Sequence, residues 1–289
     1  MTDSVLVPVD GSDPAMEALE HALDIAVDTD ASVHALYVAD TNQPSLVRIS
    51  TQIIDALEEE GEEIIDHVRS RAEDRDVSVT DHVVQGSPRK VILEYADTHD
   101  VDLIVMGAHG QHGLGEYFFG STTEHIVHQS EVPVLTVRAG EDATRSYPYS
   151  NVLVPTDDSA HARAALDLGS AIADRHDATL HLLFVVDELS ETIDLRSPPL
   201  SEDVERNARE LLEKTAARTD LEENRVTMAV EAGSVPHEIV SYTESNAVDL
   251  VVMGTHGMSG LDQFLLGSFT ERVIRMSPVP VLTTTSQKE

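Results

Sequence analysis

Two glycine-rich stretches have the residue types and the spacing of an anion-binding loop. The first reads Gly107-Ala-His-Gly110 and, after nine further residues, Gly120-Ser121-Thr122. The second reads Gly254-Thr-His-Gly257 and, after nine further residues, Gly267-Ser268. Glycine lets a backbone turn and approach a ligand closely, and the amides at a helix start, with nearby hydroxyl groups, suit a phosphate. One copy alone reads equally well as a glycine-rich turn with a capping serine, but two copies with identical spacing favour the ligand site.

Other phosphate-binding and metal-binding chemistries find less support in the residues. His109 and His256 lie inside the two stretches and could contact phosphate, although exposed histidines without a ligand are the favoured interpretation. Neither half offers three well-spaced metal ligands, so we predict no protein metal site. The Gly-x4-Gly-Lys-Ser/Thr motif of P-loop ATPases is absent, and no lysine stands near either glycine stretch. Backbone amides, with Mg²⁺ or Mn²⁺ on the phosphate oxygens, would therefore neutralise a bound phosphate.

The glycine stretches belong to a repeat that holds one offset of 147 residues along the whole chain. Other repeated segments are Pro8-Val9-Asp10 with Pro155-Thr156-Asp157, Met106-Gly107 with Met253-Gly254, and Val132–Thr136 with Val279–Thr283. A period this long indicates a duplicated domain rather than a solenoid. We predict domains at residues 1–140 and 148–289, joined by a polar linker near residues 138–150.

Strand and helix signals alternate in each half. In the first half the expected strands are Ser4–Val9, Ser32–Val38, Val77–Val84, Asp102–Met106 and Val132–Val137. The expected helices are Ala15–Thr29, Thr51–Asp74, a helix capped by Ser87-Pro88 and ending near Thr98, and Gly120–Gln129, with a loop at Asn42–Ser50. Continuous apolar strands between helices predict a parallel sheet covered on both faces. The fold class is α/β: two tandem, doubly wound, five-stranded, Rossmann-like domains, each of which binds its ligand beyond the carboxyl ends of the strands.

The spacing Gly-x2-Gly-x9-Gly-Ser/Thr after the fourth strand resembles the ATP-binding signature of the universal stress protein family. The segment Val-Pro-Val-Asp10-Gly-Ser and the turn Gly86-Ser87-Pro88, echoed by Gly233-Ser234-Val235-Pro236, are similar to that family as well. The resemblance covers essentially the whole chain in two consecutive domains. It implies the fold predicted above and an adenine nucleotide, ATP with Mg²⁺ on its phosphates, in each half.

The resemblance also implies roles for individual residues. Asp10 and Asp157 would accept a hydrogen bond from the adenine amino group, Pro8 and Pro155 would shape that end of the pocket, and Val38 and Val185 would contact adenine. Ribose and phosphates would be held by Gly107, Gly110, Gly120 and Ser121 and by Gly254, Gly257, Gly267 and Ser268. For Asp10 the alternative is a helix cap, for which Ser12 or Asp13 is better placed; Asp157-Asp158-Ser159 is more ambiguous.

The composition limits partners and surroundings. Of 289 residues, 53 are Asp or Glu and 19 are Lys or Arg, so the net charge is −34. This acidity is typical of proteins adapted to molar salt, where screening suppresses self-repulsion, and an acidic mesophile protein is the alternative. With no basic stripe we predict no binding to nucleic acid or to an anionic membrane, and we expect ATP affinity to rise with salt. The chain has no cysteine and no signal-peptide or membrane-spanning pattern, so we expect a cytoplasmic protein.

The sequence offers no nucleophile with an evident base, so an ATP-binding regulatory module is preferred over an enzyme. The alternatives are a slow ATPase or nucleotide-dependent transferase on the same scaffold, and a structural adaptor without nucleotide. The resemblance further implies dimerisation through the last strand of each half, Val132–Val137 and Val279–Thr284. Because an apolar edge is a liability unless paired, we expect these edges to pair within the chain as a pseudo-dimer, with a further homodimer left open.

Overall fold

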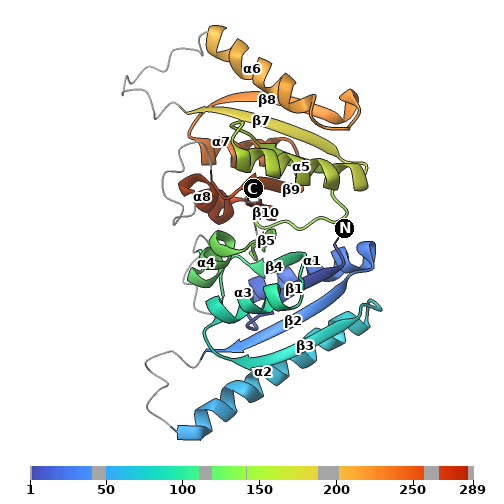
Figure 1. Ribbon diagram of the computed structural model, residues 1–289, viewed down its shortest axis with the longest axis vertical. Helices are drawn as coiled ribbons and strands as arrows, with labels where there is room; N and C mark the ends of the chain where they lie inside the picture. Colours follow the sequence, from blue (N-terminus) through green and yellow to red (C-terminus); the bar gives the residue numbers. More distant parts are fainter. Residues whose placement is uncertain are drawn as a thin grey trace. The chain divides into compact units, whose positions relative to one another are not determined.

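The computed structural model describes residues 2–40, 50–110, 119–140, 142–187, 202–256 and 267–285, with side chains in the second range described from residue 59 on. The chain divides into two compact units, Met1–Glu141 and Asp142–Glu289. In each unit helices pack on a sheet of parallel strands (Figure 1). No helix in the described part of the chain is long and apolar enough to cross a bilayer.

The described part of the first unit alternates strands and helices throughout. Its elements are β1 (Ser4–Val9), α1 (Asp13–Thr29), β2 (Ser32–Ala39), α2 (Ser50–Glu73), β3 (Val79–Gln85), α3 (Pro88–Thr98), β4 (Leu103–Gly107), α4 (Ser121–Gln129) and β5 (Val134–Val137).

The second unit repeats this order. Its described elements are β6 (Asn151–Pro155), α5 (Ala160–Arg175), β7 (Thr179–Asp187), α6 (Glu202–Ala216), the short 3-10 helix η2 (Glu223–Arg225), β8 (Val226–Gly233), α7 (Val235–Ser245), β9 (Leu250–Gly254), α8 (Ser268–Met276) and β10 (Val281–Thr284).

The strand order in the first unit is β3-β2-β1-β4-β5, and in the second unit it is β8-β7-β6-β9-β10. The neighbouring strands pair in parallel, with β1 joined to β2 on one side and to β4 on the other. The second unit has the same arrangement around β6. The direction of winding therefore reverses between β1 and β4 and between β6 and β9, as expected for a doubly wound α/β fold.

Both faces of each sheet are covered. In the first unit α1 contacts α2 and α3 contacts α4, as expected for two helix pairs on opposite faces of a doubly wound sheet. The central strand β1 is buried on both faces, since Val5, Leu6 and Val7 have no exposed surface. This two-sided burial explains why the strands read as continuous apolar runs rather than as alternating patterns.

Three strands begin later than the sequence indicated: β4 by one residue, at Leu103, and β3 and β5 by two residues each. The two larger differences have a local cause. The amide of Val77 closes the end of α2 by donating to the carbonyl of Ala72 (3.1 Å), so β3 begins only at Val79. The Ser130 hydroxyl and the backbone of Val132 form a tight turn. Pro133 has no amide hydrogen to donate to a neighbouring strand, so β5 begins at Val134.

Helix starts follow the predicted cap residues with one exception. Ser12 caps α1 by accepting from the amide of Ala15, but Ser87 sits at the cap of α3 without making the expected side-chain hydrogen bond. The expected loop Asn42–Ser50 lies outside the described residues except for Ser50, which begins α2.

One repeated acidic residue joins two strand starts in each unit. A carboxylate oxygen of Asp102 accepts from the amides of Asp3 (2.8 Å) and Ser4 (3.0 Å), where β1 begins. Asp249 does the same for Ser150 (2.7 Å) and Asn151 (2.9 Å). This repeated Val-Asp-Leu segment thus serves the sheet, at the edge opposite to the glycine stretches.

Candidate functional site

The candidate site of the first unit lies where strand order reverses. Asp10 follows the last residue of β1, and Gly107 is the last residue of the neighbouring strand β4. Because parallel strands end at the same edge, the topology brings both residues to one crevice. Pro8 and Val38 lie near the ends of the adjacent strands β1 and β2, at the same edge.

Asp10 combines a turn-forming role with a position facing the glycine loop. Its Oδ1 accepts from the amide of Ser12 (3.0 Å) and from the Ser12 hydroxyl (2.5 Å), which orients the residue that caps α1. Its Oδ2 faces Gly110 so closely that a Cβ there would lie 2.2 Å from this oxygen. The helix cap belongs to Ser12, and the carboxylate reaches across to the strand-exit loop.

The second unit resolves the ambiguous Asp157-Asp158-Ser159 segment. Asp157 takes the position of Asp10, because its Oδ1 accepts from the amide of Ser159 (3.0 Å) and Ser159 caps α5. Asp158 adopts a left-handed backbone (φ 59°) and pairs with Arg163 at 2.9 Å. The hydrogen bond from Arg163 lowers the pKa of Asp158, with the nearby charges of Arg218 and Lys214 acting in the same direction.

The first glycine of each stretch is required by packing. A Cβ on Gly107 would lie 2.8 Å from the carbonyl carbon of Pro14 and 2.9 Å from the amide nitrogen of Ala15. A Cβ on Gly254 would lie 2.6 Å from the Cβ of His161. Both contacts are with the first turn of the helix that follows the first strand of the unit, α1 or α5, so these glycines let the end of the fourth strand lie against that helix start.

The later glycine of each stretch closes the loop onto the strand. The amide of Gly120 donates to the carbonyl of Ala108 (2.9 Å), and the hydroxyl of Thr123 donates to the carbonyl of Gly107 (2.9 Å). These bonds hold the start of α4 beside the end of β4.

The second unit makes the same two bonds. Gly267 donates to Thr255 (2.9 Å), and Thr270 donates to Gly254 (2.9 Å). Sequence reasoning missed Thr123 and Thr270, although both recur at the 147-residue offset.

Helix α4 begins without a side-chain cap. Gly120 stands at its cap position, and the first intrahelical hydrogen bond runs from the amide of Glu124 to the carbonyl of Gly120 (2.8 Å). The amides of the three residues from Ser121 onward therefore have no partner within the helix. Ser121 is exposed and Thr122 half-buried. Helix α8 begins in the same way at Gly267 and Ser268. Each start can donate several amides to an anion.

The two sites differ in their histidines. In the first unit burial lowers the pKa of His109, the charge of Arg138 lowers it further, and Asp10 opposes the shift. In the second unit the rings of His161 and His256 lie 5.2 Å apart. Burial lowers the pKa of His161, followed by His256, and Asp157 opposes this. Sequence reasoning missed His161, because Pro14 occupies its place in the first unit.

The remaining sequence-predicted residues fall into three groups. Pro155 and Val185 lie toward the carboxyl ends of β6 and β7 and are half-buried. Four motif residues are less than one-tenth exposed and pack in the interior: Val9, Met106, Thr156 and Met253. Gly257 lies outside the described residues.

An open parallel sheet whose strand order reverses at its centre, with helices on both faces, defines a doubly wound, Rossmann-like α/β protein. The sequence profile of the universal stress protein family matches residues 1–138 and 148–284. The chain therefore belongs to the universal stress protein family and carries two of its domains in tandem.

Individual relatives agree with this assignment. A universal stress protein of Methanocaldococcus jannaschii is 36% identical over 139 residues, which cover 46% of this chain and 81% of that protein. One from Synechocystis is 23% identical over 303 residues, which cover 97% and 99% of the two chains. The crystal structure of a universal stress protein from Archaeoglobus fulgidus superimposes with a TM-score of 0.76 at 24% identity, covers 99% and 97% of the two chains, and shows the same fold.

Proposed function

We propose that each unit binds an adenine nucleotide, ATP with Mg²⁺ or Mn²⁺ on its phosphates, and that the protein acts as a regulatory module in a stress response. One observation carries the proposal. In both units a carboxylate after the first strand and an uncapped helix start after the fourth strand lie at the same sheet edge. The carboxylate suits the adenine amino group, and the helix start suits the phosphates.

The residues at the helix starts fit a polyphosphate that brings its own cation. Amides and hydroxyls of Ser121 and Ser268 can donate to phosphate oxygens, while the acidic chain disfavours an anion. A divalent cation on the phosphates, and salt in solution, would both reduce this repulsion. We therefore expect ATP affinity to rise between low and molar KCl; calorimetric titration showing weaker binding in molar KCl would contradict this expectation.

Calorimetric titration of the full chain with Mg-ATP tests the proposal, with two sites per chain as the expected stoichiometry. Asp10→Ala should leave one site, because it removes the carboxylate of the first unit. Ser12→Ala is the matched control, since it removes the hydroxyl bond to Asp10 and the side-chain cap of α1 but keeps the carboxylate. If Asp10→Ala and Ser12→Ala lost ATP binding equally, Asp10 would only form the turn and would not contact the ligand. If the unmodified chain did not bind ATP, the proposal would be refuted.

We assign the protein a regulatory rather than an enzymatic role. A phosphate-release assay with Mg-ATP tests this assignment, and the expected result is no turnover above that of the Asp10→Ala, Asp157→Ala double variant. Sustained release by the unmodified protein that this double variant lacks would favour the ATPase alternative. Titrations with ADP, AMP and cyclic AMP identify which adenine nucleotide binds best.

We also propose that the apolar strands β5 and β10 pair with each other within one chain. The proposal rests on the sequence pattern, since an apolar edge favours a partner strand. The chain has no cysteine, so Thr136→Cys and Thr283→Cys can be introduced together without side reactions. Oxidation should give a faster-migrating monomer on non-reducing gels. Cross-linking only between chains would contradict pairing within the chain.

A further inference from the structure

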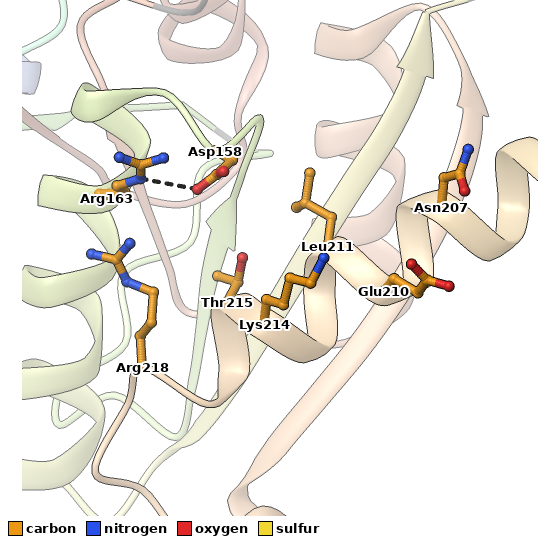
Figure 2. Close-up of a pocket in the computed structure, with 8 residues that line it drawn as sticks. All are labelled: Asp158, Arg163, Asn207, Glu210, Leu211, Lys214, Thr215 and Arg218. Atoms are coloured by element: carbon orange, nitrogen blue, oxygen red, sulfur yellow. Dashed lines mark hydrogen bonds and ion pairs between the residues drawn. The ribbon is translucent and has the colours of Figure 1, made fainter.

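A cavity of about 430 Å³ in the second unit is lined by three basic side chains. It lies between the start of α5 and the helix α6 (Figure 2). Its lining residues are Asp158, Arg163, Asn207, Glu210, Leu211, Lys214, Thr215 and Arg218. Three of the 19 basic residues of the chain are among them, including one of its three lysines. On a protein with a net charge of −34, such a concentration of cations requires an explanation.

The cations of the cavity are incompletely neutralised. Arg163 uses its Nε to pair with Asp158 at 2.9 Å, which leaves its two terminal amino groups for another acceptor. Within the described part of the chain, Lys214 and Arg218 make no side-chain hydrogen bond or ion pair. In Figure 2 the guanidinium of Arg218 points toward Arg163 and Asp158. With Glu210 as the second acidic side chain, the lining carries three positive and two negative charges.

Helix electrostatics account for only part of this arrangement. Lys214 lies in the last turn of α6, where the helix dipole favours a cation, and Arg218 lies two residues beyond the end of the helix. Both side chains line the same cavity, so two like charges are held near one another. Arg163 lies about one turn into α5, where the dipole disfavours a cation. Arg163 therefore lies where the dipole of α5 is unfavourable for a cation, and it lines the same cavity as two other cations.

The first unit lacks this charge cluster. At the 147-residue offset Met16 replaces Arg163 and His67 replaces Lys214. Arg71 is retained in the place of Arg218, but Glu20 neutralises it with an ion pair of 2.6 Å. The duplicated fold therefore does not require the cluster, which is a property of the second unit.

We propose that this cavity is an anion site that binds a small molecule bearing a phosphate group, separate from the glycine loops. Guanidinium groups present paired donors that match the oxygens of a phosphate, and the ammonium group of Lys214 adds a third cation. The volume is within the range of small-molecule sites. Leu211 supplies an apolar wall for an organic portion. The proposal stands independently of nucleotide binding at the strand-exit sites.

The test is calorimetric titration of the full chain with two probes, inorganic pyrophosphate and glucose 6-phosphate. We expect one saturable site per chain for at least one probe. Lys214→Gln and Arg218→Gln should each weaken binding by about tenfold or more, the usual loss for a charge-assisted hydrogen bond. The matched control is Arg206→Gln on the same helix, because Arg206 pairs with Asp203 and does not line the cavity. It should leave the affinity unchanged within about twofold.

Several outcomes would overturn the proposal. The first is that neither probe shows saturable binding. The second is that Arg206→Gln weakens binding as much as Lys214→Gln or Arg218→Gln does. The third is that the Lys214→Gln, Arg218→Gln double variant binds the probe undiminished while its melting temperature is unchanged. The Ser121→Asp, Ser268→Asp double variant separates this site from the nucleotide sites, because it places a carboxylate at each helix start that is proposed to hold phosphate. It should bind the probe as the unmodified chain does, and a loss of probe binding there would assign the anion to the glycine loops. Tighter binding of glucose 6-phosphate than of pyrophosphate would support the role of the Leu211 wall.

Discussion

A methyl group added to Gly107 and one added to Gly110 should have opposite consequences. In Gly107→Ala the new Cβ would lie within 3 Å of the backbone of Pro14 and Ala15, which cannot move without shifting the start of α1. Overpacking of this kind costs about 1–3 kcal/mol. For a unit of this size that cost corresponds to a fall in melting temperature of about 3–10 °C. Neither glycine has a left-handed backbone, so steric contact alone produces the effect.

In Gly110→Ala the Cβ instead meets the end of a side chain, the Oδ2 of Asp10 at 2.2 Å. The carboxylate can rotate away, which costs about 0.5–1.5 kcal/mol for a weakened hydrogen bond to Ser12. However, this rotation moves the group proposed to receive adenine. We expect the first site to lose about tenfold or more in ATP affinity, whereas Gly107→Ala retains its affinity at temperatures where it is folded.

Calorimetric melting and ATP titration of the two variants provide the measurement. Gly254→Ala is the internal control, because its Cβ would meet His161 in the second unit and should lower stability there in the same way. The reasoning would be refuted if Gly107→Ala melted like the unmodified chain. It would also be refuted if the variants lost ATP binding equally while both remained fully folded.

Three further predictions concern stability. Burial, followed by the charge of His99, lowers the pKa of His34 below 6.5. The unfolded chain therefore binds the proton more readily, and stability is lost as the pH falls below that value. His99→Asn should reduce this loss, and an unchanged difference between the urea midpoints at about pH 7.5 and 5.5 would contradict the prediction. Asp102→Ala removes the acceptor of two backbone amides and should cost about 1–3 kcal/mol in urea unfolding, with no change in ATP affinity. Thr123→Val keeps the side-chain shape but leaves the buried carbonyl of Gly107 without the hydroxyl donor, so it should lower the free energy of unfolding by about 1–3 kcal/mol. A melting temperature equal to that of the unmodified chain would show that this hydrogen bond does not stabilise the fold.

The sequence by itself determined the duplication, the order of strands and helices, and the sheet edge at which the candidate sites lie. These features have local signals. The repeat is read directly, apolar runs mark strands buried on both faces, and Ser12 and Gly120 mark helix starts within a few residues. Chain direction in a parallel sheet then places Asp10 and Gly107 at one edge.

Only the tertiary structure decided what the individual residues at that edge do. Gly107 packs against a helix start more than 90 residues away in sequence, and His161 faces His256 across a similar separation. The basic cavity brings Arg163 of α5 together with Lys214 of α6 and with Arg218, which lies just after α6. No sequence pattern records such pairs, because each depends on how side chains from separate elements approach one another after the sheet has formed.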